Sequence, residues 1–106
     1  MSLFGFLKLP DINKGVEEYS SLEGAVLLDV RDKEEYQAGH IPGAVNIPRD
    51  EISRAKEMFP DAETPIFAYC YSGRRSDIAV TALKKMGYQN VRNIGGITAF
   101  KGELEK

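Results

Sequence analysis

Two short apolar runs constrain the fold of this chain more than any other feature of its sequence. Residues 25–30 are Ala-Val-Leu-Leu-Asp-Val, and residues 66–70 are Ile-Phe-Ala-Tyr-Cys. Apolar and polar residues do not alternate in the first run, which predicts a strand that is buried on both faces. The second run is apolar and β-prone, and it also predicts a strand. Strands buried on both faces are typical of parallel sheets, because the connections between parallel strands place helices on the two faces. We therefore expect an α/β fold, with a parallel β-sheet of about four to five strands and helices on both faces.

Helical and strand-like segments alternate along the rest of the chain, with short connections between them. Asp11 and Asp32 are suitable N-cap residues for two helices, and Gly87 lies where a later helix should end. The predicted strands cover residues 25–30, 44–47, 66–70 and 90–94, and the predicted helices cover residues 11–20, 32–39, 51–59, the segment between Ser76 and Gly87, and 97–104. We expect one domain over residues 11–106, preceded by an apolar arm over residues 1–10.

Composition argues against several classes of function. The 106 residues suffice for one hydrophobic core, and a formal net charge of −2 gives no reason to expect nucleic acid or a membrane as a partner. One cysteine excludes an internal disulfide, and no Cys/His cluster suggests a metal. A single free thiol fits a reducing compartment, so we expect a cytoplasmic protein. The apolar segment 3–7 is too short to span a membrane and lacks the flanks of a signal peptide.

The one cysteine, Cys70, lies at the carboxyl end of a predicted strand, where parallel sheets have their ligand sites. A turn and then an amphipathic helix follow it; the turn consists of Tyr71, Ser72, Gly73, Arg74, Arg75 and Ser76. Backbone N–H groups and the positive end of the helix dipole would converge near the sulfur and form a site for an anion. The same field lowers the pKa of a thiol and favours the reactive thiolate. Arginines at a helix N-terminus are electrostatically unfavourable without an anion, so Arg74 and Arg75 support this interpretation.

Three segments resemble the signatures of the rhodanese (thiosulfate sulfurtransferase) family. The first is the loop from Cys70 to Ser76, which is similar to the active-site loop of that family. The second runs from Leu28 to Ala44 and contains Leu-Asp-Val-Arg, Glu-Tyr and Gly-His-Ile-Pro-Gly-Ala. The third is Asn-Ile-Gly-Gly at 93–96, followed by Phe100 at a position where the family often has Trp. Together they cover about residues 11–103 and occur in the expected order.

The resemblance implies a two-step sulfur transfer without a metal or an organic cofactor. Cys70 would take the sulfane sulfur of a small anionic donor such as thiosulfate and hold it as a persulfide. A thiol, cyanide or a protein acceptor would then remove it. The backbone of residues 71–76 would stabilise the persulfide, and the two arginines would attract the donor, with Arg75 folded toward the loop and Arg74 more exposed. A small, monomeric domain should leave the thiol fairly open to solvent.

Other interpretations of the same residues remain. The chain could be a rhodanese-like binding or regulatory module with little catalysis. Phosphatase chemistry is disfavoured, because the four residues between Cys70 and Arg75 make a narrower loop than the cysteine-dependent phosphatases have. Asp29, Arg31 and His40 could suggest a triad with Cys70, but we expect them to give structural support, with His40 in a turn held by a hydrogen bond to a neighbouring residue. Ser76 could cap the helix, contact the sulfur, or do both.

Overall fold

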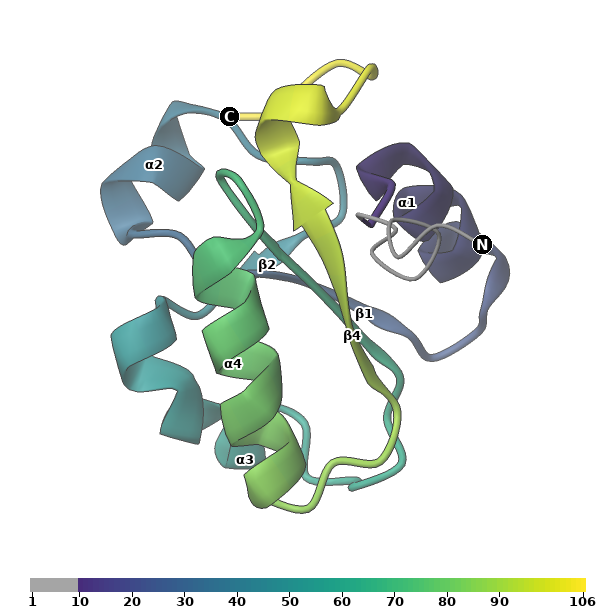
Figure 1. Cartoon of the computed structure of the whole chain (residues 1–106), viewed down its shortest axis with the longest axis vertical. Coiled ribbons are helices and arrows are strands. Elements are labelled where there is room, and N and C mark those ends of the chain that lie inside the picture. The colour runs from purple at the N-terminus through teal and green to yellow at the C-terminus, as the bar shows by residue number, and fades with distance from the viewer. Residues whose placement is uncertain (1–9) are drawn as a thin grey trace, which may run out of the picture.

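Four parallel strands form one sheet at the centre of the described chain (Figure 1). The structure is a computed structural model, and it describes residues 10–106. The strands are β1 (Val26–Asp29), β2 (Val45–Asn46), β3 (Ile66–Cys70) and β4 (Val91–Gly96), and their order across the sheet is β2-β1-β3-β4. The two apolar runs are therefore the two central strands, and the predicted fold class is confirmed.

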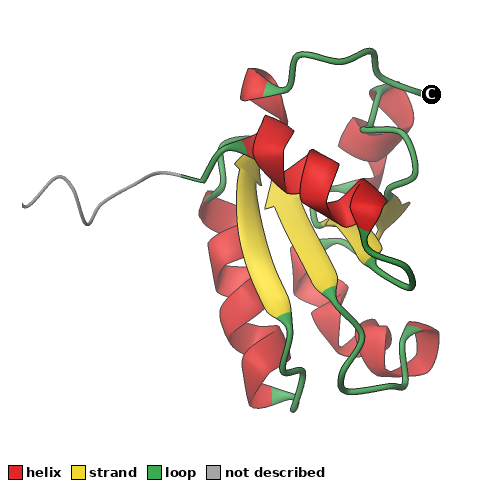
Figure 2. Ribbon diagram, turned by 90° about the vertical axis from the view of Figure 1, so that its right-hand side faces the viewer, coloured by secondary structure: helices red, strands yellow, loops and turns green. Residues whose placement is uncertain are grey.

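Helices cover both faces of this sheet, and Figure 2 shows the strands lying between them. The helical segments are α1 (Ile12–Ser21), α2 (Lys33–Ala38), the 3-10 helix η2 (Arg49–Arg54), α3 (Ala55–Met58), α4 (Arg74–Lys85) and the 3-10 helix η3 (Ile97–Ala99). Because side chains of a strand alternate between its faces, β3 contributes to two cores. Ile66, Ala68 and Cys70 pack with α4, whereas Phe67 and Tyr69 pack with α1. Cys70 therefore points toward the side of the sheet on which α4 lies.

Two of the predicted helices differ from those in the structure. Residues 51–59 form the end of a 3-10 helix and one short α-helix, and Glu51 interrupts the regular backbone with φ −112° and ψ 20°. The helix predicted over residues 97–104 ends at Ala99. The side chain of Asn13 donates a hydrogen bond to the Ala99 carbonyl (3.0 Å) and accepts one from the backbone N–H two residues later (2.9 Å). This side chain from α1 takes the place of the hydrogen bonds that would continue the helix.

The short strand β2 is half the length of the predicted strand 44–47. Ala44 belongs to a turn in which its N–H donates to the Ile41 carbonyl, and Pro48 cannot donate to a strand ladder. The predicted arm lies almost wholly outside the described residues. Within residues 10–106, no helix combines the length and the apolar character needed to cross a membrane.

Candidate functional site

The sulfur of Cys70 lies beneath the loop that connects β3 to α4. The residue is 1% exposed, so the expectation of a thiol that is fairly open to solvent is wrong. The loop folds back over the sulfur: the Gly73 N–H donates a hydrogen bond to Sγ over 2.9 Å, and the Ser76 hydroxyl lies 3.4 Å from Sγ. The sulfur is therefore surrounded by hydrogen-bond donors instead of water.

Opposing effects act on the pKa of the Cys70 thiol. Burial raises this pKa, because a thiolate is poorly solvated inside a protein. Hydrogen bonds from the Ser76 hydroxyl and from the backbone N–H groups of Ser76, Gly73 and Ser72 lower it. The hydrogen bonds outweigh burial, so the pKa lies below the ordinary value of a cysteine. The site is built to hold negative charge on sulfur.

Two glycines allow the loop to fold so closely over the sulfur. Gly73 has a φ of +101°, a left-handed conformation that side chains rarely adopt, and it aims its N–H at Sγ. Gly96, the last residue of β4, lies directly under the loop. A Cβ on Gly96 would collide with the Tyr71 carbonyl oxygen and with the backbone of Ser72. The sequence indicates the first glycine as a turn residue but gives no sign of this close approach at the second.

The two arginines of the loop have different surroundings. Arg75 is partly buried and forms a bidentate ion pair with Glu35 of α2, with distances of 2.7 Å (Nη1 to Oε1) and 3.1 Å (Nη2 to Oε2). Arg74 is the more exposed of the two. The charge of Arg75 is thus largely balanced by a carboxylate, whereas the charge of Arg74 faces the surface.

Glu35 connects α2 to the candidate site, and the sequence analysis assigned it no such role. The hydrogen bond from Arg75 is the main reason that the pKa of Glu35 falls to about 2. The same carboxylate accepts the Asp32 N–H over 2.9 Å. The spacing of Asp32 and Glu35 is already explained by helix capping, so nothing in the local pattern points to a partner in a distant loop.

A surface hollow of about 610 Å³ opens beside the loop, between the start of α4 and η3. Gly73, Arg74 and Thr98 contribute to its walls. A larger hollow, of about 730 Å³, lies at the other end of the sheet, where β3 and β4 begin. We assign the candidate site to the smaller hollow, because it adjoins the Cys70 loop and has Arg74, together with Asp77, in its wall.

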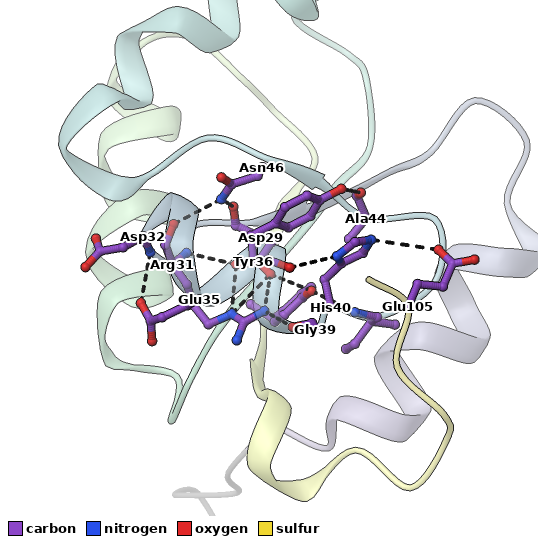
Figure 3. A network of polar contacts seen from close by, with 12 residues as sticks. Asp29, Arg31, Asp32, Glu35, Tyr36, Gly39, His40, Ala44, Asn46 and Glu105 are labelled. Carbon is purple, nitrogen blue, oxygen red and sulfur yellow. Dashed lines mark hydrogen bonds and ion pairs between the residues drawn. The ribbon is translucent and has the colours of Figure 1, made fainter.

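Asp29 and Arg31 belong to a buried polar network at the carboxyl end of β1 (Figure 3). Arg31 Nη2 donates to Asp29 Oδ2 and to the Gly39 carbonyl, each over 2.7 Å. The Tyr69 hydroxyl donates to Asp29 Oδ2 (2.7 Å) and accepts the Ile41 N–H (3.1 Å). Burial raises the pKa of Tyr69, and the charge of Asp29 raises it further, so the hydroxyl remains a donor. The contacts of these residues are those of a scaffold that joins β1, β3 and the segment after α2.

His40 also makes structural contacts, although not those expected from the sequence. Its ring stacks on Tyr36, with centroids 3.8 Å apart, and its Nδ1 lies 2.9 Å from the Tyr36 carbonyl oxygen (Figure 3). Its backbone N–H and carbonyl pair with the backbone of Glu105, each over 2.8 Å. The expected hydrogen bond to an adjacent turn residue is replaced by a bridge to the last residues of the chain.

Three other residues of the loop, Tyr71, Ser72 and Ser76, were also predicted to belong to the site. Tyr71 and Ser72 are exposed, and Tyr71 is 55% exposed. Ser76 does not cap α4, because the N-cap position is occupied by Gly73 and the cap has no side-chain hydrogen bond. Instead, its hydroxyl contacts Cys70 and, over 2.7 Å, the side chain of Asn93, to which the sequence analysis assigned no role. Among residues 10–106, no group of three or more His, Cys, Asp or Glu side chains is placed to hold a metal ion.

Comparisons with known proteins point to one family of domains. The family model of the rhodanese-like domain matches residues 12–103. Thiosulfate sulfurtransferase PspE of Escherichia coli is 42% identical over 71 residues, covering 66% of this chain and 68% of PspE. Human thiosulfate:glutathione sulfurtransferase is 36% identical over 95 residues, covering 77% of this chain and 81% of the human protein. A solved structure of a rhodanese with anions from E. coli has a TM-score of 0.72 at 37% identity, covering 77% of this chain and 98% of the other.

Some curated relatives are much longer than this chain. It spans 48% of a Bacillus subtilis relative and 25% and 24% of relatives from Ogataea parapolymorpha and Meyerozyma guilliermondii. The family match nevertheless extends from the first turn of α1 to beyond η3 and includes the Cys70 loop. The chain belongs to the rhodanese family.

Proposed function

We propose that the protein is a sulfurtransferase that moves a sulfane sulfur from thiosulfate, or a related anionic donor, to a thiophilic acceptor through a persulfide on Cys70. One observation carries this proposal: the Cys70 sulfur receives hydrogen bonds from the Gly73 N–H and the Ser76 hydroxyl at the start of α4. A thiolate or persulfide anion gains from each of these donors. The names of two relatives, which specify thiosulfate, support the choice of donor.

In the first step, the Cys70 thiolate attacks the outer sulfur of thiosulfate. A new S–S bond forms to Cys70, the S–S bond within thiosulfate breaks, and sulfite leaves with the electron pair. Arg74 attracts the dianionic donor to the hollow beside the loop. The negative charge stays on the terminal sulfur of the persulfide, where the donors of the loop stabilise it.

In the second step, an acceptor attacks the terminal sulfur of the persulfide. Cyanide, a small thiolate or a protein thiolate forms the new bond to this sulfur, and the Cys70 thiolate leaves with the electrons of the broken S–S bond. The lowered pKa of Cys70 makes it a good leaving group. Because the anchoring sulfur is buried, a protein acceptor would need to present a narrow segment at the loop.

Mass spectrometry of the intact protein tests this cycle. We expect incubation with thiosulfate to add the mass of one sulfur atom, and subsequent cyanide or a thiol to remove it. In Cys70→Ser the mass gain and the sulfur transfer should both disappear, because a serine hydroxyl does not form the persulfide. Thermal unfolding of the variant controls for the fold, and we expect its midpoint to remain near that of the original protein.

The outcomes separate the candidate functions. Turnover in Cys70→Ser equal to that of the original protein would exclude the persulfide mechanism. If the folded original protein, with a reactive thiol, gains no sulfur from thiosulfate or from a low-molecular-weight persulfide, the chain is a binding or regulatory module instead. A gain from the persulfide but not from thiosulfate would identify the donor as a persulfide.

A further inference from the structure

The side chain of Asn93 makes three hydrogen bonds beneath the Cys70 loop. Its Nδ2 donates to the Gly73 carbonyl over 2.9 Å, and its Oδ1 accepts the Gly95 N–H over 3.0 Å. A carbonyl can only accept and an N–H can only donate, so these two backbone groups fix which end of the amide is which. The Ser76 hydroxyl, 2.7 Å from Oδ1, must therefore be the donor in the third hydrogen bond.

The geometry of β4 explains how the Asn93 side chain reaches the Cys70 loop. The pairing of β3 with β4 shifts by one residue between Ala68 and Tyr69, so that Ala68 pairs with Asn93 but Tyr69 pairs with Gly95. At this bulge the Gly95 N–H turns to the Asn93 side chain, and Gly95 adopts a φ of +111°. The side chain of Asn93 thus reaches the start of α4, on the face of the sheet toward which Cys70 points.

The two loop groups held by Asn93 belong to the residues that donate hydrogen bonds to the sulfur. Gly73 presents its carbonyl to Asn93 and its N–H to Cys70 Sγ. Ser76 presents its hydroxyl to both Asn93 and Sγ, at 2.7 Å and 3.4 Å. A hydroxyl has one proton, so it turns from the neutral amide to the sulfur when the sulfur is charged, because a charge-assisted hydrogen bond is stronger. Asn93 Oδ1 then still has the Gly95 N–H as its donor.

We propose that Asn93 is a positioning residue, which holds the Gly73 peptide in the orientation that donates to the Cys70 sulfur and accepts the Ser76 proton for as long as that sulfur is a neutral thiol. Its value for catalysis rests on the proposed sulfur transfer, but the arrangement itself concerns only the thiol and its donors. Without the amide, the loop loses a link to β4 and the Ser76 proton no longer has Asn93 Oδ1 as a competing acceptor. The net contribution of Ser76 to the thiolate is therefore smaller when Asn93 is present, because ionisation of Cys70 breaks the hydrogen bond between Ser76 and Asn93.

The pH dependence of Cys70 alkylation by iodoacetamide tests this dependence, because only the thiolate reacts. In the original background, we expect Ser76→Ala to raise the pH midpoint of the reaction by about one unit, since a donor to the thiolate is lost. In the Asn93→Ala background, the same Ser76→Ala change should raise the midpoint by at least about 0.5 unit more, because the hydroxyl no longer gives up a hydrogen bond to the amide when it turns to the thiolate. An effect of Ser76→Ala that is unchanged or smaller in that background would overturn the proposal; a smaller effect would mean that Asn93 directs the hydroxyl toward the sulfur and does not compete with it for the proton.

Asn90→Ala is a matched control. Asn90 precedes β4, and its Nδ2 also donates to one backbone carbonyl, that of Glu63, over 3.0 Å. We expect this variant to lose a comparable hydrogen bond without moving the alkylation midpoint or changing the effect of Ser76→Ala. If Asn93→Ala does not fold, Asn93→Val removes the amide and leaves no side-chain acceptor, while keeping a residue suited to a strand. The same coupling is then measured in that background.

The outcome of this experiment does not depend on whether the proposed function is correct. Alkylation requires a thiolate but no sulfur donor, so the coupling between Asn93 and Ser76 can be present in a protein that transfers no sulfur. Conversely, a protein that forms the persulfide but shows no such coupling would retain the proposed function and exclude the role of Asn93.

Discussion

At the scale of single residues, Arg74 and Arg75 differ in how much of their positive charge is available to attract an anion. Glu35 holds Arg75 through two hydrogen bonds, so this guanidinium fixes the loop against α2. Arg74 lies on the wall of the hollow beside the Cys70 loop. We therefore propose different tasks for the two adjacent arginines: Arg75 orients the loop, and Arg74 attracts the anionic donor.

We expect Arg75→Ala to lower kcat/KM for thiosulfate by about 10- to 100-fold, because a loop displaced by about 1 Å costs on that order. Arg74→Ala should raise KM by about 2- to 5-fold with little change in kcat, and the difference from the original protein should shrink at high salt. Steady-state kinetics at two ionic strengths would measure both effects. A larger loss of kcat/KM in Arg74→Ala would show that the two roles are reversed.

At the scale of elements, the connection from β3 to α4 depends on how closely it approaches the end of β4. The left-handed Gly73 turns the chain, and the absence of a side chain at Gly96 lets the loop pass directly over the last residue of β4. The backbone of Gly96 itself is ordinary, with φ −120° and ψ 140°, so any residue could adopt it. Glycine is required at this position because the loop leaves no room for a side chain.

Gly96→Ala should therefore disturb the loop more than the fold. We expect sulfur transfer to fall by about 100-fold, since the added Cβ displaces the backbone of Tyr71 and Ser72 from over the sulfur. The rate of Cys70 alkylation near neutral pH should change as well. Far-UV circular dichroism should stay the same. Full activity in this variant would mean that the loop adjusts freely and that the approach to β4 is unimportant.

The sequence predicts the strand, turn and helix of this connection but not the side chains that support it. Cys70 and Ser76 are close along the chain, so the local pattern is enough to indicate a candidate site. Glu35 lies 40 positions before Arg75, and Asn93 lies 17 positions after Ser76. Contacts of this kind depend on which elements pack together, and local patterns carry no record of them. The same reason explains η3, whose length is limited by Asn13 from the other end of the chain.

At the scale of the whole molecule, the ion pair between Glu35 and Arg75 joins α2 to α4, two helices that β2 and β3 separate in the sequence. The folded state holds the pKa of Glu35 at about 2, below its ordinary value of 4.5. A carboxyl group with a lowered pKa stabilises the folded state fully above its ordinary pKa, and the stabilisation is lost as the pH falls toward the lower value.

Thermal unfolding of Glu35→Gln between pH 7 and pH 2 tests this link. Because the pair is partly exposed, we expect the variant to lose about 1 kcal/mol of unfolding free energy or less near pH 7, equivalent to a few degrees in Tm. The difference between the variant and the original protein should remain constant down to about pH 5 and shrink toward zero near pH 2. A difference that does not depend on pH would show that the charge of Glu35 is not responsible.

The burial of Cys70 also affects whether other molecules can reach its sulfur during the proposed cycle. A persulfide extends the side chain of Cys70, a residue that is 1% exposed, by one S–S bond of about 2 Å. The transferable sulfur is thus bonded to an anchoring atom that other molecules cannot easily reach. Two resting molecules cannot readily bring their buried sulfurs within bonding distance of each other. An unloaded protein is therefore protected against dimerising through a disulfide between two Cys70 residues.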